Sequence, residues 1–365
     1  MTTFTTTLTT TEKKLRNFAE QVLIASGADK EEASIVAEIL VWCDFIGRDN
    51  QGVWRLPIHT QRIEKGLINT PCNFSVQQDS TAALLIDGKQ GMGHYLAYKG
   101  MEKAIQVAKE TGIAFVGVSD SNFFGAGAYY IQQAASAGMI GIATSNSFPK
   151  VAAFQGINSV LGTNPFAFSA PRQNGHHLLL DMATSASAGS SIRKAIEKNE
   201  HLPDGIAVDS NGNSINNPHD VAQGTILPFG GAKGYGLSLM VEILSGIITG
   251  AGFSHGVKSM YKNLDESSNN GHCFIVIDIN KLIPLDSYFE RMEHFIGFLR
   301  ESGAEGEGEG EGEGETNNQN KKVLLPGELR WETFEKNQQE GLTINEKTTA
   351  ELKKLAEHYN IDFID

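Results

Sequence analysis

The chain has 365 residues, a formal net charge of −13 at neutral pH and 40 % apolar residues. This length suggests two or three domains, or one large domain with appendages, and the apolar content is enough for a substantial core. It has no apolar run of membrane length, no basic patch that would neutralise phosphates and no secretory signal in Met1–Thr11, so we expect neither a membrane nor a nucleic acid as partner. The odd number and wide spacing of Cys43, Cys72 and Cys273 predict reduced thiols, a cytoplasmic location and no metal site.

Residues 1–74 are expected to form a helical N-terminal domain. Apolar side chains recur there at the spacing of one helix face, and Asp29 with Glu32 forms a capping-box-like pair at the start of the second helix. Gly27 is a natural stop for the first helix. Helices are predicted over residues 12–26, 29–43 and 53–66.

Residues 75–301 change to short apolar, β-branched runs that alternate with helical patterns, which indicates a central α/β domain. Its clearest part runs from Ile113 to Ala143, where strand, helix and strand follow one another. Strands are predicted at about residues 82–86, 113–118, 140–143, 178–180 and 273–277, and helices at about 95–111, 126–137 and 235–249.

Glycine alternates with glutamate from Glu305 to Glu315, and this low-complexity composition predicts a disordered linker over residues 302–322. Like charges repel there, and ordering glycine is entropically unfavourable. Residues 323–365 are expected to form a C-terminal helical segment, with a helix at 348–359, that packs on the N-terminal domain.

Three segments of small, turn-forming residues lie at strand or helix ends: Gly162–Pro165, Asp181–Ser185 and Gly230–Gly236. The last one opens a helix and contains Lys233, and free amides at a helix start beside a lysine form an anion site. The alternative is a flexible entry loop with a solvated lysine. Asp181 is suited to accept hydrogen bonds from ribose hydroxyls, or to cap the following helix.

A Rossmann fingerprint is not supported by the sequence. Gly125-Ala126-Gly127 opens a helix after a predicted strand, but the distance to that strand is too long and the third glycine is absent.

Arg55 is the candidate substrate-binding residue, because an arginine binds a carboxylate through two parallel hydrogen bonds. It lies one helical turn from Gln51 and from His59, which places three polar side chains on one face. A surface salt bridge for Arg55 and a boundary position for His59 are the alternatives.

The chain resembles the malate/L-lactate dehydrogenase family of the non-Rossmann type. The motifs that carry the resemblance are kept in order and spacing over most of the chain: Ser121–Ala126, Gly162–Pro165, Asp181–Ser185 and Gly230–Gly236. The family includes sulfolactate and ureidoglycolate dehydrogenases and cyclic-imine reductases. The resemblance implies an NAD- or NADP-dependent oxidoreductase, a homodimer, and a sulfolactate dehydrogenase-like fold with a small carboxylate substrate held between the central and helical domains.

The resemblance also implies which residues form the site. Arg55 falls where the family grips the substrate carboxylate. Ser147, Asp181, Met182, Ala183 and Lys233 fall where the family contacts the nicotinamide cofactor, and the shared motifs add Ser121, Asn122, Thr163 and Asn164.

Two departures from the family pattern affect proton transfer. Phe123 stands where the family has its proton-transferring histidine, and Gln51 stands where it has a second histidine. A positioned histidine contributes about 10²–10⁴-fold to such a step, and phenylalanine cannot replace it. Ordinary malate or lactate dehydrogenation is therefore expected to be badly impaired.

Three interpretations remain open at this point. The first is an imino-acid reductase, in which Arg55 holds the carboxylate, Phe123 supplies an apolar wall and a protonated substrate needs no protein acid. The second is a 2-hydroxy or 2-oxo acid dehydrogenase in which His59, or the more distant Lys150, moves the proton. The third is a non-catalytic paralogue. An active oxidoreductase is favoured because every cofactor motif persists while only substrate-side groups differ.

Overall fold

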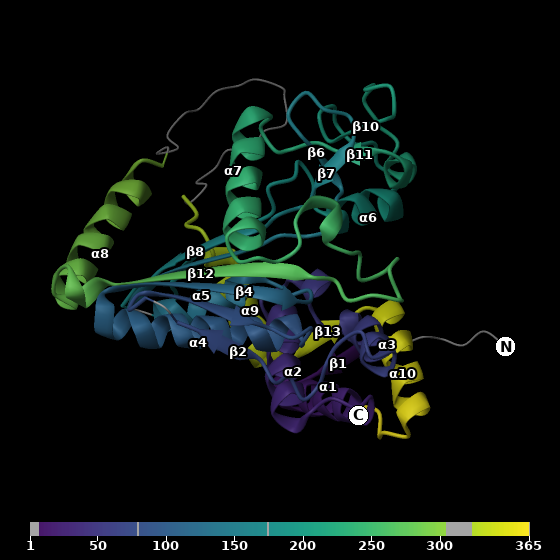
Figure 1. The fold of residues 1–365 in the computed structure, drawn as a ribbon, viewed down its shortest axis with the longest axis horizontal. Helices are drawn as coiled ribbons and strands as arrows, with labels where there is room; N and C mark the ends of the chain where they lie inside the picture. The colour runs from purple at the N-terminus through teal and green to yellow at the C-terminus, as the bar shows by residue number, and fades with distance from the viewer. Residues whose placement is uncertain (1–6, 79, 174, 304–322, 365) are drawn as a thin grey trace, which may run out of the picture.

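The central strand of the larger sheet comes from late in the sequence. In the computed structural model, which describes residues 7–78, 80–173, 175–303 and 323–364, strand β12 (Asn270–Asp278) lies between β4 (Ile113–Ser121) and β5 (Met139–Ser145) (Figure 1). It is antiparallel to both. The seven-stranded sheet has the order β2-β3-β4-β12-β5-β8-β9. Its other strands are β2 (Ser75–Gln77), β3 (Ala83–Asp87), β8 (Phe166–Ala170) and β9 (Leu178–Met182).

The predicted strand, helix and strand of this region are present as β4, α5 (Gly127–Ser136) and β5, but the two strands are not neighbours. Only β3 and β4 pair in parallel, and every other pair in this sheet is antiparallel. The insertion of β12 is a long-range event, so local periodicity predicts the strands without predicting their order.

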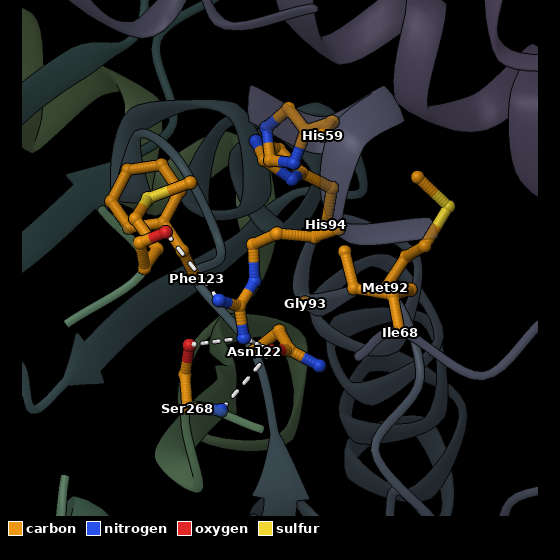
Figure 2. Close-up of a pocket in the computed structure, with 10 residues that line it drawn as sticks. His59, Ile68, Met92, Gly93, His94, Asn122, Phe123 and Ser268 are labelled. Atoms are coloured by element: carbon orange, nitrogen blue, oxygen red, sulfur yellow. Dashed lines mark hydrogen bonds between the residues drawn. The ribbon is translucent and has the colours of Figure 1, made fainter. Parts of the chain in front are cut away.

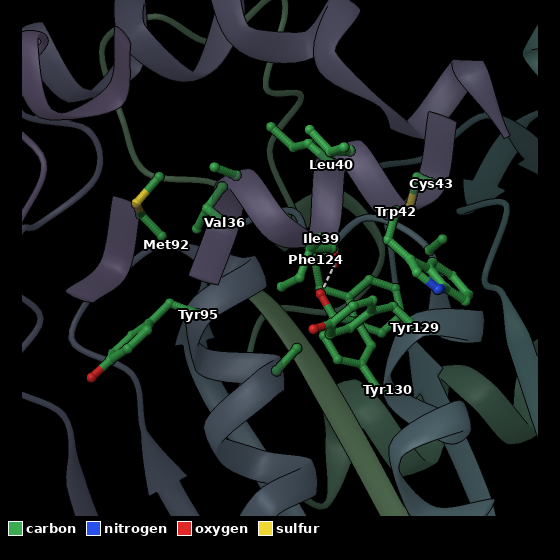
Figure 3. Close-up of a cluster of buried hydrophobic side chains, with 14 of the residues drawn as sticks. Val36, Ile39, Leu40, Trp42, Cys43, Met92, Tyr95, Phe124, Tyr129 and Tyr130 are labelled. Carbon is green, nitrogen blue, oxygen red and sulfur yellow. Dashed lines mark hydrogen bonds between the residues drawn. The ribbon is translucent and has the colours of Figure 1, made fainter. Parts of the chain in front are cut away.

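Helices α4 (Gly93–Thr111) and α5 cover one face of this sheet, and α2 (Lys30–Phe45) packs beside them (Figure 1). Figure 3 shows the resulting aromatic core, where Trp42 of α2 meets Tyr129 edge-on with ring centroids 5.3 Å apart. Phe124 stacks on Tyr130 at 5.4 Å, and the Tyr130 hydroxyl donates to the Phe124 carbonyl. This core fixes the segment that leads from β4 into α5.

One buried imidazole links the three central strands. His272 of β12 lies 2.9 Å from the Ser145 hydroxyl through Nδ1 and 2.8 Å from the Ser121 hydroxyl through Nε2. Burial lowers the pKa of His272 to about 3, so the ring is neutral and carries a single N–H. One serine therefore accepts from the ring while the other donates to it.

The N-terminal domain begins with α1 (Glu12–Ala25) and α2, close to the predicted ranges. The predicted third helix is wrong in its first turn. Residues Val53–Arg55 form a 3-10 turn, η2, preceded by a second one at Asp49–Gln51, η1, and α3 spans only Leu56–Glu64. Pro57 is the reason, because its ring is tolerated in the first turn of a helix but not further inside.

The C-terminal residues return to the N-terminal domain. Strand β13 (Leu342–Ile344) pairs antiparallel with β1 (Leu8–Thr10), and α10 (Glu346–Tyr359) contacts α1 and α3. Helix α9 (Glu328–Glu340), which contacts α2, lies within the segment predicted as helical, but its bounds were not predicted. The predicted linker over residues 302–322 lies almost wholly outside the described residues.

A second, smaller sheet lies within the region predicted as one central domain. It has the strand order β10-β11-β6-β7 and its own apolar core, which includes Val151 and Leu161. Its elements are β6 (Val151–Ala152), β7 (Ser159–Leu161), β10 (Ala207–Val208) and β11 (Thr225–Ile226), with α6 (Gly189–Lys198) packed nearby. The strands have two or three residues each, too few for a periodic signal in the sequence.

Helix α7 (Ala232–Glu242) lies on the opposite face of the large sheet from α4 and α5 (Figure 1). The predicted helix at 235–249 starts earlier and ends in a π-helical turn, η4 (Ile243–Ile247). A Cβ on Gly271 of β12 would lie 1.7 Å from the Ser245 carbonyl oxygen, so this widened turn lies directly against the strand.

Helix α8 (Leu285–Glu301) projects from the end of the large sheet (Figure 1). The sequence did not predict it, and two of its aromatic rings, Phe295 and Phe298, are 54 % and 57 % exposed. No helix in the described ranges is long and apolar enough to cross a membrane.

The bridge formed by His272 gives a test of the central sheet. Replacing His272 with leucine keeps the volume but removes both imidazole contacts, and a buried polar group that loses its partner costs about 1–3 kcal/mol. We expect His272→Leu to lower the free energy of unfolding by about 2 kcal/mol. Denaturant unfolding measures it, with Ile275→Leu on the same strand as the control. Wild-type stability in His272→Leu would show that the bridge contributes nothing.

Candidate functional site

The Gly162–Pro165 turn is held by polar contacts. The Ser147 hydroxyl accepts from the Thr163 N–H at 3.0 Å, and the Asn164 side-chain oxygen accepts from the Ser147 N–H at 3.2 Å. A Cβ on Gly162 would lie 2.3 Å from the Ser147 carbonyl, so glycine is required for this close approach. Two predicted cofactor segments, at Ser147 and at Thr163–Asn164, therefore lie together.

The other predicted cofactor segments join this turn. The Thr184 N–H donates to the Thr163 carbonyl at 2.9 Å, and the Phe229 N–H donates to the Thr184 carbonyl at 3.1 Å. Asn164 is fully buried and donates to Glu242 of α7 at 2.6 Å. The strand end at Met182–Ala183 and helix α7 are thus fixed to the same turn, although Asn164 and Glu242 are 78 residues apart in sequence.

The N-terminus of α7 has the character of an anion site. Gly230 and Gly231 have φ angles of 55° and 63°, and no side chain caps the helix. Lys233 in the first turn is exposed and has no carboxylate partner among the described residues. Uncapped N–H groups and an adjacent ammonium are suited to the phosphates of a dinucleotide. The role of Lys233 stays a prediction.

Asp181 at the end of β9 has a structural role as well as its predicted one. Its Oδ2 accepts from the Ala128 N–H in the first turn of α5 at 3.0 Å and pairs with Arg48 of the N-terminal domain at 3.0 Å. The carboxylate therefore caps α5 and not the helix that follows it in sequence. Oδ1 has no hydrogen bond within the described part of the chain, which leaves it for the predicted ribose contact.

Ser121 and Asn122 are engaged inside the protein. Ser121 binds His272, and the Asn122 amide donates to the carbonyls of Gln90 and Gly91, both at 3.0 Å. Neither residue is more than 3 % exposed. Their direct contact with a cofactor stays a prediction, and their observed role is to hold the segment that carries Phe123.

Arg55 is buried, and no surface salt bridge is formed. Its guanidinium lies 4.3 Å above the Phe123 ring and 5.0 Å from the Trp54 ring, and Nε donates to the Asn50 carbonyl at 2.9 Å. Nη1 donates to the Tyr261 hydroxyl, while Nη2 has no protein acceptor among the described residues. A buried guanidinium that lacks a carboxylate is unfavourable unless an anion binds it.

Other cations face the same place. Arg193 of α6 lies 4.7 Å from the Trp54 ring, on which Arg55 also rests. The pKa of Lys150 is lowered by desolvation and then by the positive charges of Lys262 and Arg55. In a chain whose net charge is −13, this local positive field indicates a site for a small anion.

The loop that carries Arg55 is held by a buried carboxyl group. Asp44 accepts from the Val53 N–H at 2.8 Å, and a Cβ on Gly52 would lie 2.0 Å from the same side chain. Burial raises the pKa of Asp44 well above its usual range. The Gln51 side-chain oxygen, which this loop places nearby, is buried without a partner in the described part of the chain.

Two imidazoles lie beside Phe123 (Figure 2). His59 and His94 meet edge-on with ring centroids 5.0 Å apart, and His94 meets Phe123 at 5.8 Å. Burial, and then the charges of Arg55 and Arg62, lower the pKa of His59 to about 3. The pKa of His94 is lowered well below its usual value by burial, and then by His59, Arg55 and His272. Both rings are therefore neutral at neutral pH, and neither carries a proton that it readily gives up.

The sequence did not single out His94, Arg62 or Tyr261. His94 is the second residue of α4 and lies on its buried stripe with Ala97, Met101 and Ala104. A lone histidine on an apolar helix face is normally a core residue, so the sequence pattern predicts a structural role for His94 and not a place in the site. Tyr261 lies in an irregular segment, where spacing gives no information.

Comparisons with known proteins cover almost the whole chain. A family model described as malate/L-lactate dehydrogenase matches residues 10–353. The chain is 35 % identical over 347 residues to the malate/(S)-sulfolactate dehydrogenase of Methanothermus fervidus, covering 95 % of this chain and 97 % of that protein. The structure of malate dehydrogenase from Pyrococcus horikoshii OT3 matches with a TM-score of 0.85 and 34 % identity, over 98 % of this chain and 97 % of that chain.

A third comparison concerns a different reaction. The structure of Δ1-piperideine-2-carboxylate reductase from Pseudomonas syringae pvar. tomato matches with a TM-score of 0.84 and 26 % identity. The match covers 96 % of this chain and 100 % of that chain. These structures confirm the predicted mixed α/β fold of the non-Rossmann type.

The buried state of His59 gives a pH-dependent test. Its folded pKa of about 3 lies below the ordinary value of 6.5, so the unfolded chain binds this proton first as the pH falls. The stability that neutral His59 allows is therefore present above about pH 6.5 and is lost progressively toward pH 3. We expect the free energy of unfolding to fall less steeply between pH 6 and 4 in His59→Gln than in the wild type. The difference between the two slopes is expected to be about 1.4 kcal/mol per pH unit.

Denaturant unfolding at several pH values measures this slope. Thr60→Ser, on the same helix, removes no titratable group and is expected to keep the wild-type slope. An identical slope in His59→Gln and the wild type would mean that His59 is not held neutral by the fold.

Proposed function

Because this chain belongs to the malate/L-lactate dehydrogenase family, and is therefore an oxidoreductase that uses a nicotinamide cofactor, we propose that it reduces a C=N bond in a small imino acid. The observation that carries the proposal is the pairing of Arg55 with Phe123. The site has a guanidinium without a carboxylate partner among the described residues, and it rests on an apolar ring at the position where the resemblance implies a proton-transferring histidine.

The cofactor would be held by the segments that converge on the Gly162–Pro165 turn. The uncapped amides of α7 and Lys233 suit its phosphates, and the vacant Oδ1 of Asp181 suits a ribose hydroxyl. The nicotinamide, when bound, supplies the hydride. Whether the adenosine end carries a 2′-phosphate, and hence whether the cofactor is NAD or NADP, is part of the test below.

Arg55 would bind the substrate carboxylate through Nη2, the guanidinium nitrogen without a protein acceptor. Phe123 supports the guanidinium from below and closes that side of the site with an apolar surface. Nε and Nη1 are already fixed by Asn50 and Tyr261, so the guanidinium is oriented before the substrate arrives.

The preference for C=N follows from proton chemistry. A protonated iminium already carries the proton and the positive charge that a carbonyl would have to receive from the protein. The imidazoles nearest to Phe123 are neutral in this site, and so neither offers a proton to a carbonyl oxygen directly. The structural similarity to a Δ1-piperideine-2-carboxylate reductase supports the same bond type.

A second candidate is reduction of a 2-oxo acid, or oxidation of the 2-hydroxy acid, with His59 in the proton-transfer role. The specific observation in its favour is the buried His59–His94 pair beside Phe123. Most of the relatives described above act on such acids by name, which supports this candidate independently.

The first functional prediction concerns the substrate. Wild-type protein with NADPH or NADH is expected to reduce cyclic or open 2-imino acids at least about tenfold faster, in kcat/KM, than the matching 2-oxo acids. Spectrophotometric cofactor oxidation measures both, and comparison of the two cofactors at equal concentration settles their preference. Brisk reduction of 2-oxo acids without turnover of any imino acid would contradict the proposal, and cofactor binding without any turnover would indicate a non-catalytic paralogue.

The second prediction concerns Arg55. Arg55→Lys keeps the charge but loses the planar fork and the stacking on Phe123, so KM for the carboxylate substrate is expected to rise at least about tenfold. Steady-state kinetics measure it, with Arg16→Lys, a partly exposed residue of α1, as the matched control. Unchanged KM in Arg55→Lys would exclude Arg55 from substrate binding.

A further inference from the structure

We propose that His94 exchanges a proton with the substrate through one buried water molecule that it shares with His59. The inference rests on the proposed nicotinamide-dependent reduction, but not on whether the reducible bond is C=N or C=O. It adds a proton-transfer group to a site from which the family's histidine is missing.

His94 is packed closely against the segment that carries Phe123. A Cβ on Gly125, which has a φ of 83°, would lie 2.6 Å from His94 Nε2. A Cβ on Gly93 would lie 2.1 Å and 2.3 Å from the carbonyl oxygens of Asn122 and Phe123. The start of α4 and this segment therefore fit together only because both positions are glycine, and the imidazole is brought to the edge of the Phe123 ring.

The polar atoms of this region lack partners. His94 is 1 % exposed, and neither of its ring nitrogens has a hydrogen-bond partner among the described residues. His59 Nε2 and Arg62 Nε are in the same state. A buried polar group without a partner costs about 1–3 kcal/mol, so four such atoms in one place require an occupant.

A cavity between these side chains has room for that occupant. It measures about 10 Å³ and its lining includes His59, Arg62, His94, Asn122, Phe123 and Ser268 (Figure 2). This volume corresponds to a single water, and a buried water needs two to four polar partners. The unpartnered nitrogens of His59, His94 and Arg62 are enough to hold it.

Substrate binding would change the charge state of His94. The groups that face it are His59 of α3, Arg55 of η2 and His272 of β12, with Arg62 of α3 across the cavity. Burial, then His59 and the positive charge of Arg55, keep the pKa of His94 low. A carboxylate bound to Arg55 offsets that charge, so it raises the pKa of His94 and favours uptake of a proton from solvent.

The proton then has a defined path. When hydride reaches the substrate carbon, the π electrons of the C=X bond move onto X, which is nitrogen or oxygen. X takes a proton from the cavity water, the water takes one from His94, and His94 returns to its neutral form. An iminium that arrives protonated needs no such transfer, whereas a neutral imine or a 2-oxo acid needs one proton for each hydride.

The water is tested without any activity. A high-resolution crystal structure of the wild-type protein is expected to show one ordered water within about 3 Å of a His94 nitrogen and of His59 Nε2. A dry cavity, or a His94 ring that bonds directly to another protein group, would overturn the shared-water path.

The proton transfer is tested with His94→Phe and His94→Gln. For a neutral imine or 2-oxo acid substrate we expect kcat to fall about 100-fold with little change in KM, and the solvent deuterium isotope effect on kcat to increase, because proton transfer then limits the rate. For an iminium substrate at a pH below its own pKa, the fall in kcat of the same variants is expected to be at least about tenfold smaller, because no proton is transferred. His177→Phe is the control, because His177 is a buried imidazole held by Ser136 and Arg172 at a distance from this site.

The outcomes separate the two proposals. Less than a threefold change in kcat for folded His94 variants, or a wild type that reduces only protonated iminium substrates, overturns the role of His94 and leaves the proposed function intact. Absence of nicotinamide-dependent turnover with every small carboxylate defeats the proposed function itself. Should His94→Phe fail to fold, the kcat of His94→Gln decides the same question, because this variant keeps a polar side chain that can bind the water.

Discussion

A buried guanidinium without a carboxylate partner is the constraint on which the site depends. Arg55 is oriented by Asn50, Tyr261 and the Phe123 ring, and its remaining nitrogen has no protein acceptor in the described residues. Such an arrangement is stable only with compensation, because an unpaired charge in a protein interior is expensive. The nearby Arg193 and Lys262 add positive charge instead of neutralising it. The site therefore has the charge that a small anion would complement.

Phe123 stands where the family resemblance implies an imidazole, and its phenyl ring has two effects. It cannot carry a proton, and it supplies a surface on which a guanidinium rests at 4.3 Å. Cation–π contacts of this kind contribute about 0.5–2 kcal/mol when the pair is shielded from water. The imidazoles that remain, at positions 59 and 94, are kept neutral by burial and by the same cations. Substrate binding and proton chemistry are thus coupled through Arg55.

Much of the architecture could be predicted from the sequence, for identifiable reasons. Helices with clear caps and apolar stripes, such as α1 and α2, were found nearly to the residue because their signals are local. The insertion of β12 between β4 and β5, and the small sheet built from very short strands, depend on contacts between distant residues. The segments around Thr163, Asp181 and Lys233 are recognisable as motifs in the sequence. The contact of Asp181 with the first turn of α5 depends on residues that are distant in sequence, so only the structure shows it. His94 was missed because its local pattern is that of a core residue.

Helix α8 has a consequence for the behaviour of the protein in solution. It projects from the end of the large sheet with the rings of Phe295 and Phe298 more than half exposed. Apolar area of this kind favours association, and a fold that is completed by a second copy has a melting temperature that rises with protein concentration. For a homodimer that forms through this helix, dilution shifts the protein toward monomers and lowers the melting temperature. The measured thermal stability then depends on the protein concentration as well as on the sequence.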